Sequence, residues 1–74
     1  MCGIAGIIAS DSVGSRLLEQ MVQCLHHRGP DHSGLWISEN HDVGLCHARL
    51  AVQDLSSNGN QPMVSKSGRF ILVF

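Results

Sequence analysis

The sequence predicts an α+β fold with antiparallel strands, and three observations lead to that prediction. A short apolar run at residues 2–9 opens the chain and has the length of a buried strand. Residues 16–25 then show helical periodicity, and from Ser33 the hydrophobic period changes to two, as in a half-buried strand. A chain of 74 residues holds one domain at most, and it buries little apolar surface unless a staple or further protein supports it.

One amphipathic helix follows the first strand. Its apolar side consists of five residues at helical spacing: Leu17, Leu18, Met21, Val22 and Leu25. We expect Ser12 or Ser15 to cap its N-terminus and Gly29-Pro30 to end it. The last turn would then hold the basic residues 26–28, where the helix dipole favours positive charge.

The period of two after the helix predicts a hairpin. Leu35 and Ile37 alternate with small or polar residues, and residues 39–42 form a polar turn. Residues 43–50 are then expected to return as the second strand of the hairpin.

The last third of the chain is predicted to be a loop, a turn and a strand. Residues 54–61 are rich in Ser, Asn and Gly, and Ser67-Gly68 marks a turn. Residues 70–74 form a strongly apolar strand with no charge or polar cap after it. We therefore expect residues 1–74 to be the N-terminal portion of a longer domain.

Composition excludes several classes of protein. The net charge of −1 offers no basic excess for nucleic acid, and no apolar run reaches the ~20 residues that span a membrane. No Lys or Arg precedes Arg16, so the charged start of a secretory signal is absent. Three cysteines do not close a disulfide framework and fit a reducing compartment, so we expect a cytoplasmic protein.

Cys2 is the residue with the clearest chemical potential. Removal of Met1, which is common before a small residue, would give Cys2 its own base. The α-amino group titrates at about 7.7–8.0 and a thiol at about 8.5, so the amine can take the thiol proton and return it to a leaving group. The alternative is that Cys2 is a small residue at a frayed end.

Two charged features have purely structural alternatives. Arg28 and Asp31 flank the Gly29-Pro30 turn, where an exposed ion pair between them would contribute little stability. Arg49, at the end of a predicted strand, is suited to hold a substrate carboxylate with two hydrogen bonds. Its alternative is a structural salt bridge, with Asp54 as the partner.

Zinc binding is a further alternative. Cys24 and His27 are spaced as zinc ligands are, and Cys46 and His47 follow later in the chain. Adjacent residues on a strand point to opposite faces, so Cys46 and His47 do not easily bind one ion, and Cys24 is expected in the core. We therefore assign no metal ligand, and a small non-catalytic zinc-binding module stays as the alternative. No specific role is expected for the histidines in predicted turns, His32 and His41.

Three segments, taken in order, resemble the class II glutamine amidotransferases, which are N-terminal-nucleophile hydrolases with a processed cysteine. Residues 1–7 (MCGIAGI) look like the start of these enzymes. Residues 27–31 (HRGPD), followed by Gly34, are similar to the asparagine synthetase branch, whereas related branches carry Tyr-Asp or Gln-Asp after Arg-Gly. Residues 47–54 (HARLAVQD) match the next motif of that branch. Gly59 and Gln61-Pro62-Met63 continue the match.

The resemblance implies roles for a few residues. Cys2 would be the nucleophile that attacks the side-chain amide of glutamine, and Arg49 would bind the α-carboxylate of glutamine. The backbone of four residues would line the same pocket: Leu50, Ala51, Val52 and Gln53. Ala51 stands where Ser is usual and Gln53 where an aliphatic residue is usual, and both departures are expected to affect packing.

The resemblance also implies a larger protein. The family has a four-layer α/β/β/α sandwich with antiparallel sheets, of which residues 1–74 are only the first part. Its Asn-Gly-Glu oxyanion segment and a later Asp follow Phe74, so this chain alone is expected to be inactive. We expect no cofactor here, because ATP and Mg²⁺ belong to the C-terminal synthetase domain that amidates aspartate.

The partners implied are therefore glutamine and that synthetase domain, with no nucleic acid and no membrane. The oligomeric state stays open, a homo-oligomer included. The alternative within the family is a related amidotransferase that delivers ammonia to another acceptor.

Overall fold

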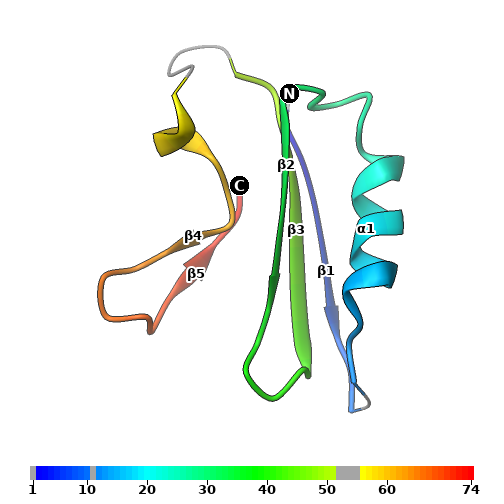
Figure 1. Cartoon of the computed structure of the whole chain (residues 1–74), viewed down its shortest axis with the longest axis vertical. Coiled ribbons are helices and arrows are strands. Elements are labelled where there is room, and N and C mark those ends of the chain that lie inside the picture. Colours follow the sequence, from blue (N-terminus) through cyan, green and yellow to red (C-terminus); the bar gives the residue numbers. More distant parts are fainter. Residues whose placement is uncertain (1, 11, 52–55) are drawn as a thin grey trace.

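The computed structural model describes residues 2–10, 12–51 and 56–74, and it shows an α+β arrangement with antiparallel sheets (Figure 1). Its elements are β1 (Gly3–Ile8), α1 (Ser15–Cys24), β2 (His32–Ile37), β3 (Val43–Arg49), the 3-10 turn η1 (Ser57–Gly59), β4 (Met63–Val64) and β5 (Ile71–Leu72). The helix α1 lies on one side of the β1–β3 pair, and the small β4–β5 hairpin lies on the side of β2 (Figure 1). The predicted α+β class with antiparallel strands is thus confirmed, and so is the hairpin predicted after the helix, which is the β2–β3 pair.

Strand β3 is the centre of the main sheet. The order β1-β3-β2 makes it the antiparallel partner of both neighbours, with Gly3 opposite Ala48 on one side and His32 opposite Arg49 on the other. Both neighbours therefore meet the same end of β3. This register brings the start of the chain and the turn before β2 together beside Arg49.

The core lies between α1 and one face of this sheet. Five buried residues form it: Val13, Leu18, Val22, Cys46 and Ala48. Because strand residues alternate, Cys46 and Ala48 face the helix whereas His47 and Arg49 lie on the opposite face. The close approach of α1 also depends on Gly44, where a Cβ atom would lie 2.8 Å from Val13 Cγ1.

The ends of the helix differ from those predicted. Gly14 is the N-cap residue and no side chain caps the helix, so neither Ser12 nor Ser15 has the predicted role. The helix ends at Cys24, and residues 25–28 form a turn in which Arg28 N–H bonds to Leu25 O. The basic residues 26–28 therefore lie beyond the last helical turn.

Cys24 is exposed, so its predicted place in the core is wrong. It lies two positions after Val22, which is about 200° around the helix from a residue that faces the sheet. Strand β1 covers six of the eight residues predicted for it, whereas β5 covers only two of the five predicted at residues 70–74.

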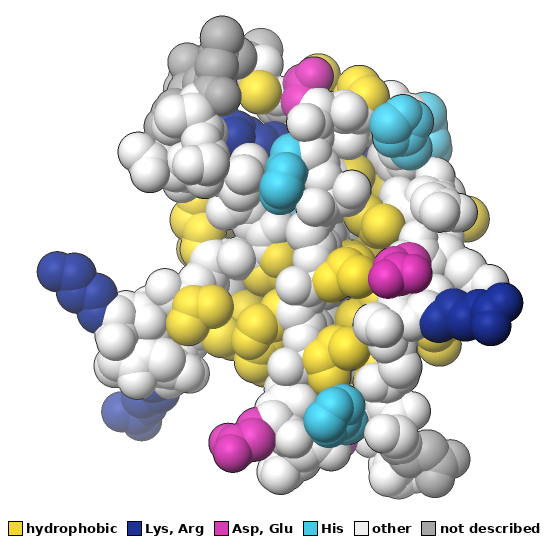
Figure 2. Space-filling model, in the orientation of Figure 1, with side chains coloured by type: hydrophobic (Ala, Val, Ile, Leu, Met, Phe, Trp, Pro, Cys, Tyr) yellow, Lys and Arg dark blue, Asp and Glu magenta, His cyan; other side chains and the backbone are white. Residues whose placement is uncertain are grey.

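Hydrophobic side chains also remain on the surface. Figure 2 shows a group of these side chains over the middle of one face, between the β4–β5 hairpin and α1. The most exposed large ones are Ile4, Ile8, Leu17, Val64, Phe70, Leu72 and Phe74. Within the described ranges, no helix is both long and apolar enough to cross a bilayer.

Candidate active site

The thiol of Cys2 lies against the residue that follows β3. Cys2 precedes β1, and the register of the Gly3–Ala48 pair, continued by one residue, brings it to the level of Arg49, next to Leu50. The backbone N–H of Leu50 donates a hydrogen bond to Cys2 Sγ over 3.3 Å. Cys2 is half-buried.

The turn between α1 and β2 connects Cys2 with the end of β3. Arg28 Nε donates to the backbone oxygen of Cys2 at 3.2 Å. Asp31 N–H donates to Arg49 O at 3.0 Å, and the Asp31 carboxylate accepts the N–H of Ala51 at 2.8 Å. Arg28 and Asp31 thus bond to other segments instead of forming the predicted ion pair with each other.

Glycine is required in this turn because it lies directly on β3. A Cβ atom at Gly29 would collide with the carbonyl group of Ala48. Such a clash with backbone costs much free energy to relieve, because a strand held in a sheet cannot move aside as the tip of a side chain can. The Arg-Gly-Pro-Asp segment therefore reaches Cys2 and Ala51 only with glycine at its second position.

Arg49 is surrounded by a turn of the chain. Its side chain is 7% exposed, and Nη1 donates to Ser56 O at 2.6 Å and to Asn60 Oδ1 at 2.8 Å. Gly59 packs so closely that a Cβ atom there would lie 2.7 Å from Cζ of Arg49. Ser56 starts this turn by accepting the N–H of Asn58 on its hydroxyl at 3.2 Å. The predicted partner Asp54 lies outside the described residues.

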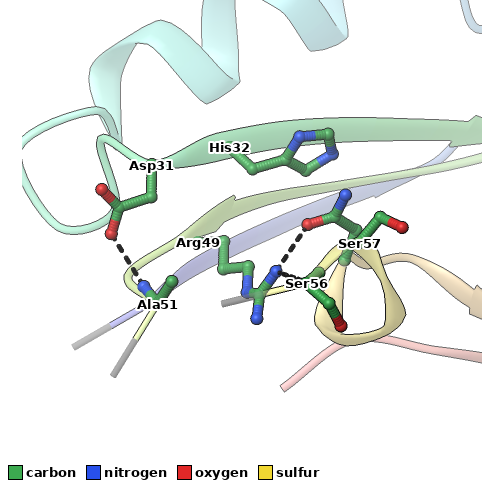
Figure 3. A pocket seen from close by; sticks show the side chains of 7 residues that line it. Asp31, His32, Arg49, Ala51, Ser56 and Ser57 are labelled. Atoms are coloured by element: carbon green, nitrogen blue, oxygen red, sulfur yellow. Dashed lines mark hydrogen bonds between the residues drawn. The ribbon is translucent and has the colours of Figure 1, made fainter. Parts of the chain in front are cut away.

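These residues enclose a pocket of about 190 Å³ (Figure 3). It is lined by Asp31, His32, Arg49, Ala51, Ser56, Ser57 and Asn60. The side chains of Asp31 and Arg49 reach it from neighbouring strand ends, and η1 closes the far side (Figure 3). One buried cation, an amide and hydroxyl groups suit a small polar ligand that carries a carboxylate.

The predicted site residues are partly brought together. Arg49 and Ala51 line the pocket, and Leu50, between them, bonds to Cys2 Sγ, so the thiol is next to the pocket wall without being part of the lining. Val52 and Gln53 lie outside the described residues.

Five lining residues were not predicted as site residues: Asp31, His32, Ser56, Ser57 and Asn60. Asp31 was considered only as an ion-pair partner of Arg28. His32 was placed in a turn with no role, but it begins β2 directly opposite Arg49. The sequence did contain a signal for Ser56, Ser57 and Asn60. They belong to a polar segment soon after Arg49, and a buried guanidinium needs oxygen acceptors nearby.

The residues weighed as zinc ligands do not converge. Cys46 is fully buried on the helix side of β3, and burial raises the pKa of its thiol above the ordinary value. His47 lies on the other face, 3.0 Å from Phe74 O, and Cys24 is exposed on α1. In the part of the chain that the structure describes, no three His, Cys, Asp or Glu side chains are grouped to hold a metal ion.

Comparison with known proteins shows the family to which this chain belongs. A family described as a glutamine amidotransferase domain matches residues 1–74. No solved structure matches the chain.

Several curated relatives cover most of this chain. Asparagine synthetase [glutamine-hydrolyzing] 1 of Arabidopsis thaliana is 39% identical over 97% of this chain and 12% of its own length. The Bacillus subtilis protein of the same name is 33% identical over 100% of this chain and 12% of its own length. Amidase chry2 of Gibberella zeae is 51% identical over 69% of this chain and 8% of its own length.

This chain therefore spans only about a tenth of the length of these relatives. The matched segment contains Cys2, the Arg-Gly-Pro-Asp turn and Arg49. Because the family pattern extends over the chain from its first residue to its last, the chain belongs to the glutamine amidotransferase domain family.

Proposed function

We propose that this protein is the glutaminase part of a glutamine-dependent asparagine synthetase. The observation that carries the proposal is the contact between Cys2 Sγ and Leu50 N–H at 3.3 Å, because it places a nucleophile one residue from the buried guanidinium of Arg49. The family match and relatives named as glutamine-hydrolysing asparagine synthetases support it.

In this proposal Cys2 performs covalent catalysis. After removal of Met1, the α-amino group of Cys2 takes the thiol proton, and the sulfur attacks the side-chain amide carbon of glutamine. The C–N bond breaks as the amine returns the proton, so ammonia leaves and a thioester remains. Water then adds to the thioester carbon, the C–S bond breaks, and glutamate and the thiol are released.

Arg49 would bind the α-carboxylate of glutamine. Its charge lies in a pocket with the amide of Asn60 and the carboxylate of Asp31, and those groups fit a zwitterionic amino acid. The backbone of Leu50 and Ala51, continued by residues 52–53, would line the same site. The acyl part of glutamine would then extend toward Cys2.

The remaining parts of the proposal concern the larger protein. We propose that the sheet β1-β3-β2 and α1 are part of a four-layer α/β/β/α sandwich, and that residues 1–74 are one portion of it. A synthetase domain, with ATP and Mg²⁺, would use the ammonia to amidate aspartate, and no residue of this chain is assigned to those ligands. We place the protein in the cytoplasm, where its cysteines would stay reduced.

Substitution of Cys2 tests the proposal in the protein as its gene encodes it. Cys2→Ala should abolish glutamine-dependent synthesis of asparagine and leave ammonia-dependent synthesis intact. Cys24→Ala, which removes an exposed thiol, is the matched control and should change neither activity. Glutamine hydrolysis that persists in Cys2→Ala would refute the assignment, and an intact mass that retains Met1 would refute the role of the amine.

A further inference from the structure

Two buried polar side chains outside the pocket hold the backbone of one residue. Gln61, 6% exposed, accepts the N–H of Phe74 on Oε1 at 2.7 Å. His47, fully buried, places Nε2 at 3.0 Å from Phe74 O. The two partners of Phe74 come from different segments, since His47 is in β3 and Gln61 precedes β4. We call this pair of contacts the Phe74 clamp.

The Phe74 clamp is a costly arrangement for a small domain. Burying polar side chains is unfavourable unless each group finds a partner. In His47 the second ring nitrogen, Nδ1, is buried and has no hydrogen-bond partner among the residues that the structure describes. An apolar residue at position 47 would avoid that cost, so the clamp needs a reason beyond filling the core.

Gln61 connects the clamp to the pocket. It directly follows Asn60, whose side chain accepts from Arg49 at 2.8 Å and lines the pocket. The backbone oxygen of Gln61 is pressed onto Gly34 in β2, where a Cβ atom would collide with it. Both the backbone and the side chain of Gln61 are therefore fixed, and they set the position of Asn60.

His47 connects the clamp to the strand that carries Arg49. It lies two residues before Arg49, so both side chains leave the same face of β3. The clamp thus ties the end of the β4–β5 hairpin to β3 next to Arg49, while Gln61 ties it to the turn around the guanidinium. A displacement of Phe74 would be transmitted to the pocket from both sides.

We propose that Gln61 and His47 are positioning residues that hold Asn60 and the 56–60 turn against the Arg49 guanidinium. This role rests on the proposed function, in which Arg49 binds the glutamine carboxylate. The carboxylate is remote from the amide that reacts. A loosened clamp therefore weakens glutamine binding, which raises the KM.

Gln61→Met, which keeps the length of the side chain and removes the acceptor, is the principal test in the protein as its gene encodes it. The KM for glutamine should rise about tenfold, because the 56–60 turn loses its support beside Arg49. Gln61→Glu keeps an acceptor oxygen and should restore the KM. Titration of active sites with an electrophilic glutamine analogue that alkylates Cys2 gives kcat per folded molecule.

His47 offers an independent pair of variants. His47→Leu removes the contact to Phe74 O and should raise the KM, whereas His47→Gln presents an amide N–H near the position of Nε2 and should raise it less. Ser67→Ala is the control, because it removes hydrogen bonds to Ser65 and Arg69 at the tip of the same hairpin without touching the clamp. Its KM should match that of the unsubstituted protein.

Equal KM values in Gln61→Met, His47→Leu and the unsubstituted protein would overturn the positioning role, whatever happens to thermal stability. A loss of kcat per titrated site at constant KM would overturn it as well. If the unsubstituted protein does not hydrolyse glutamine, the proposed function fails first, so the two failures are distinguishable.

Discussion

The backbone N–H of Leu50 and the sulfur of Cys2 are joined by a 3.3 Å hydrogen bond, although the residues are 48 positions apart in the sequence. An N–H directed at sulfur stabilises negative charge on it, which is what a nucleophilic thiol must carry. The same residue is preceded by Arg49, which lies in the pocket wall. The proposed nucleophile, Cys2, and the proposed carboxylate-binding cation, Arg49, are therefore positioned by one short stretch of backbone.

Cys2→Ser should separate binding from chemistry. A hydroxyl still accepts the Leu50 N–H, so the affinity for glutamine, measured by calorimetry, should change less than about threefold. An alcohol is a far weaker nucleophile than a thiolate at neutral pH, so hydrolysis should fall by more than about 10³-fold. Substantial ammonia release by this variant would contradict nucleophilic attack by Cys2.

Arg49→Lys should raise the KM for glutamine by about 10- to 100-fold, because an ammonium cannot form the two parallel bonds of a guanidinium to a carboxylate. It also cannot reproduce the geometry of the contacts to Ser56 O and Asn60 Oδ1. Arg69→Lys is the control, since Arg69 lies on the exposed Phe70 ring, 5.5 Å from its centroid. An unchanged KM in Arg49→Lys would exclude Arg49 from glutamine binding.

Gly59→Ala should affect binding more than stability. A Cβ atom would lie 2.7 Å from Cζ of Arg49, so the guanidinium must move from Ser56 and Asn60. The tip of a flexible side chain moves at lower cost than backbone, so the melting temperature should fall by only a few degrees while the KM rises about tenfold. In the control Gly14→Ala, the new Cβ meets nothing within 4 Å, and the KM should not change.

The thiols of Cys24 and Cys46 should differ in reactivity and in their effect on the pH dependence of stability. Cys24 is exposed and should react with iodoacetamide at pH 8 well before Cys46, which is buried and whose pKa burial raises. Because the unfolded chain releases the Cys46 proton first, the free energy of unfolding should fall as pH rises above the ordinary thiol value of 9.0. Cys46→Ala should weaken that fall, and equal alkylation rates in the folded protein would contradict the buried position.

The local pattern of the sequence was enough for much of the fold. The periods of 3.6 and 2 placed the start of α1 and both ends of β2 and β3 to within one or two residues, because each element keeps one face to the core. The local pattern did not predict the end of α1, because tertiary contacts decide where that helix stops. The helix stops at Cys24 because the chain must turn early enough for Gly29 to lie on Ala48 of β3.

For the site, the sequence by itself determined which residues have suitable chemistry, namely a thiol at Cys2 and a cation at Arg49. Residue type and motif order carry that information without any fold. Only the tertiary structure decided that Leu50 binds the sulfur, that Asp31 holds Ala51, and that Asn60 encloses the guanidinium. Those contacts join segments up to 48 residues apart, and they depend on strand register and on glycines at points of close approach, which no local pattern records.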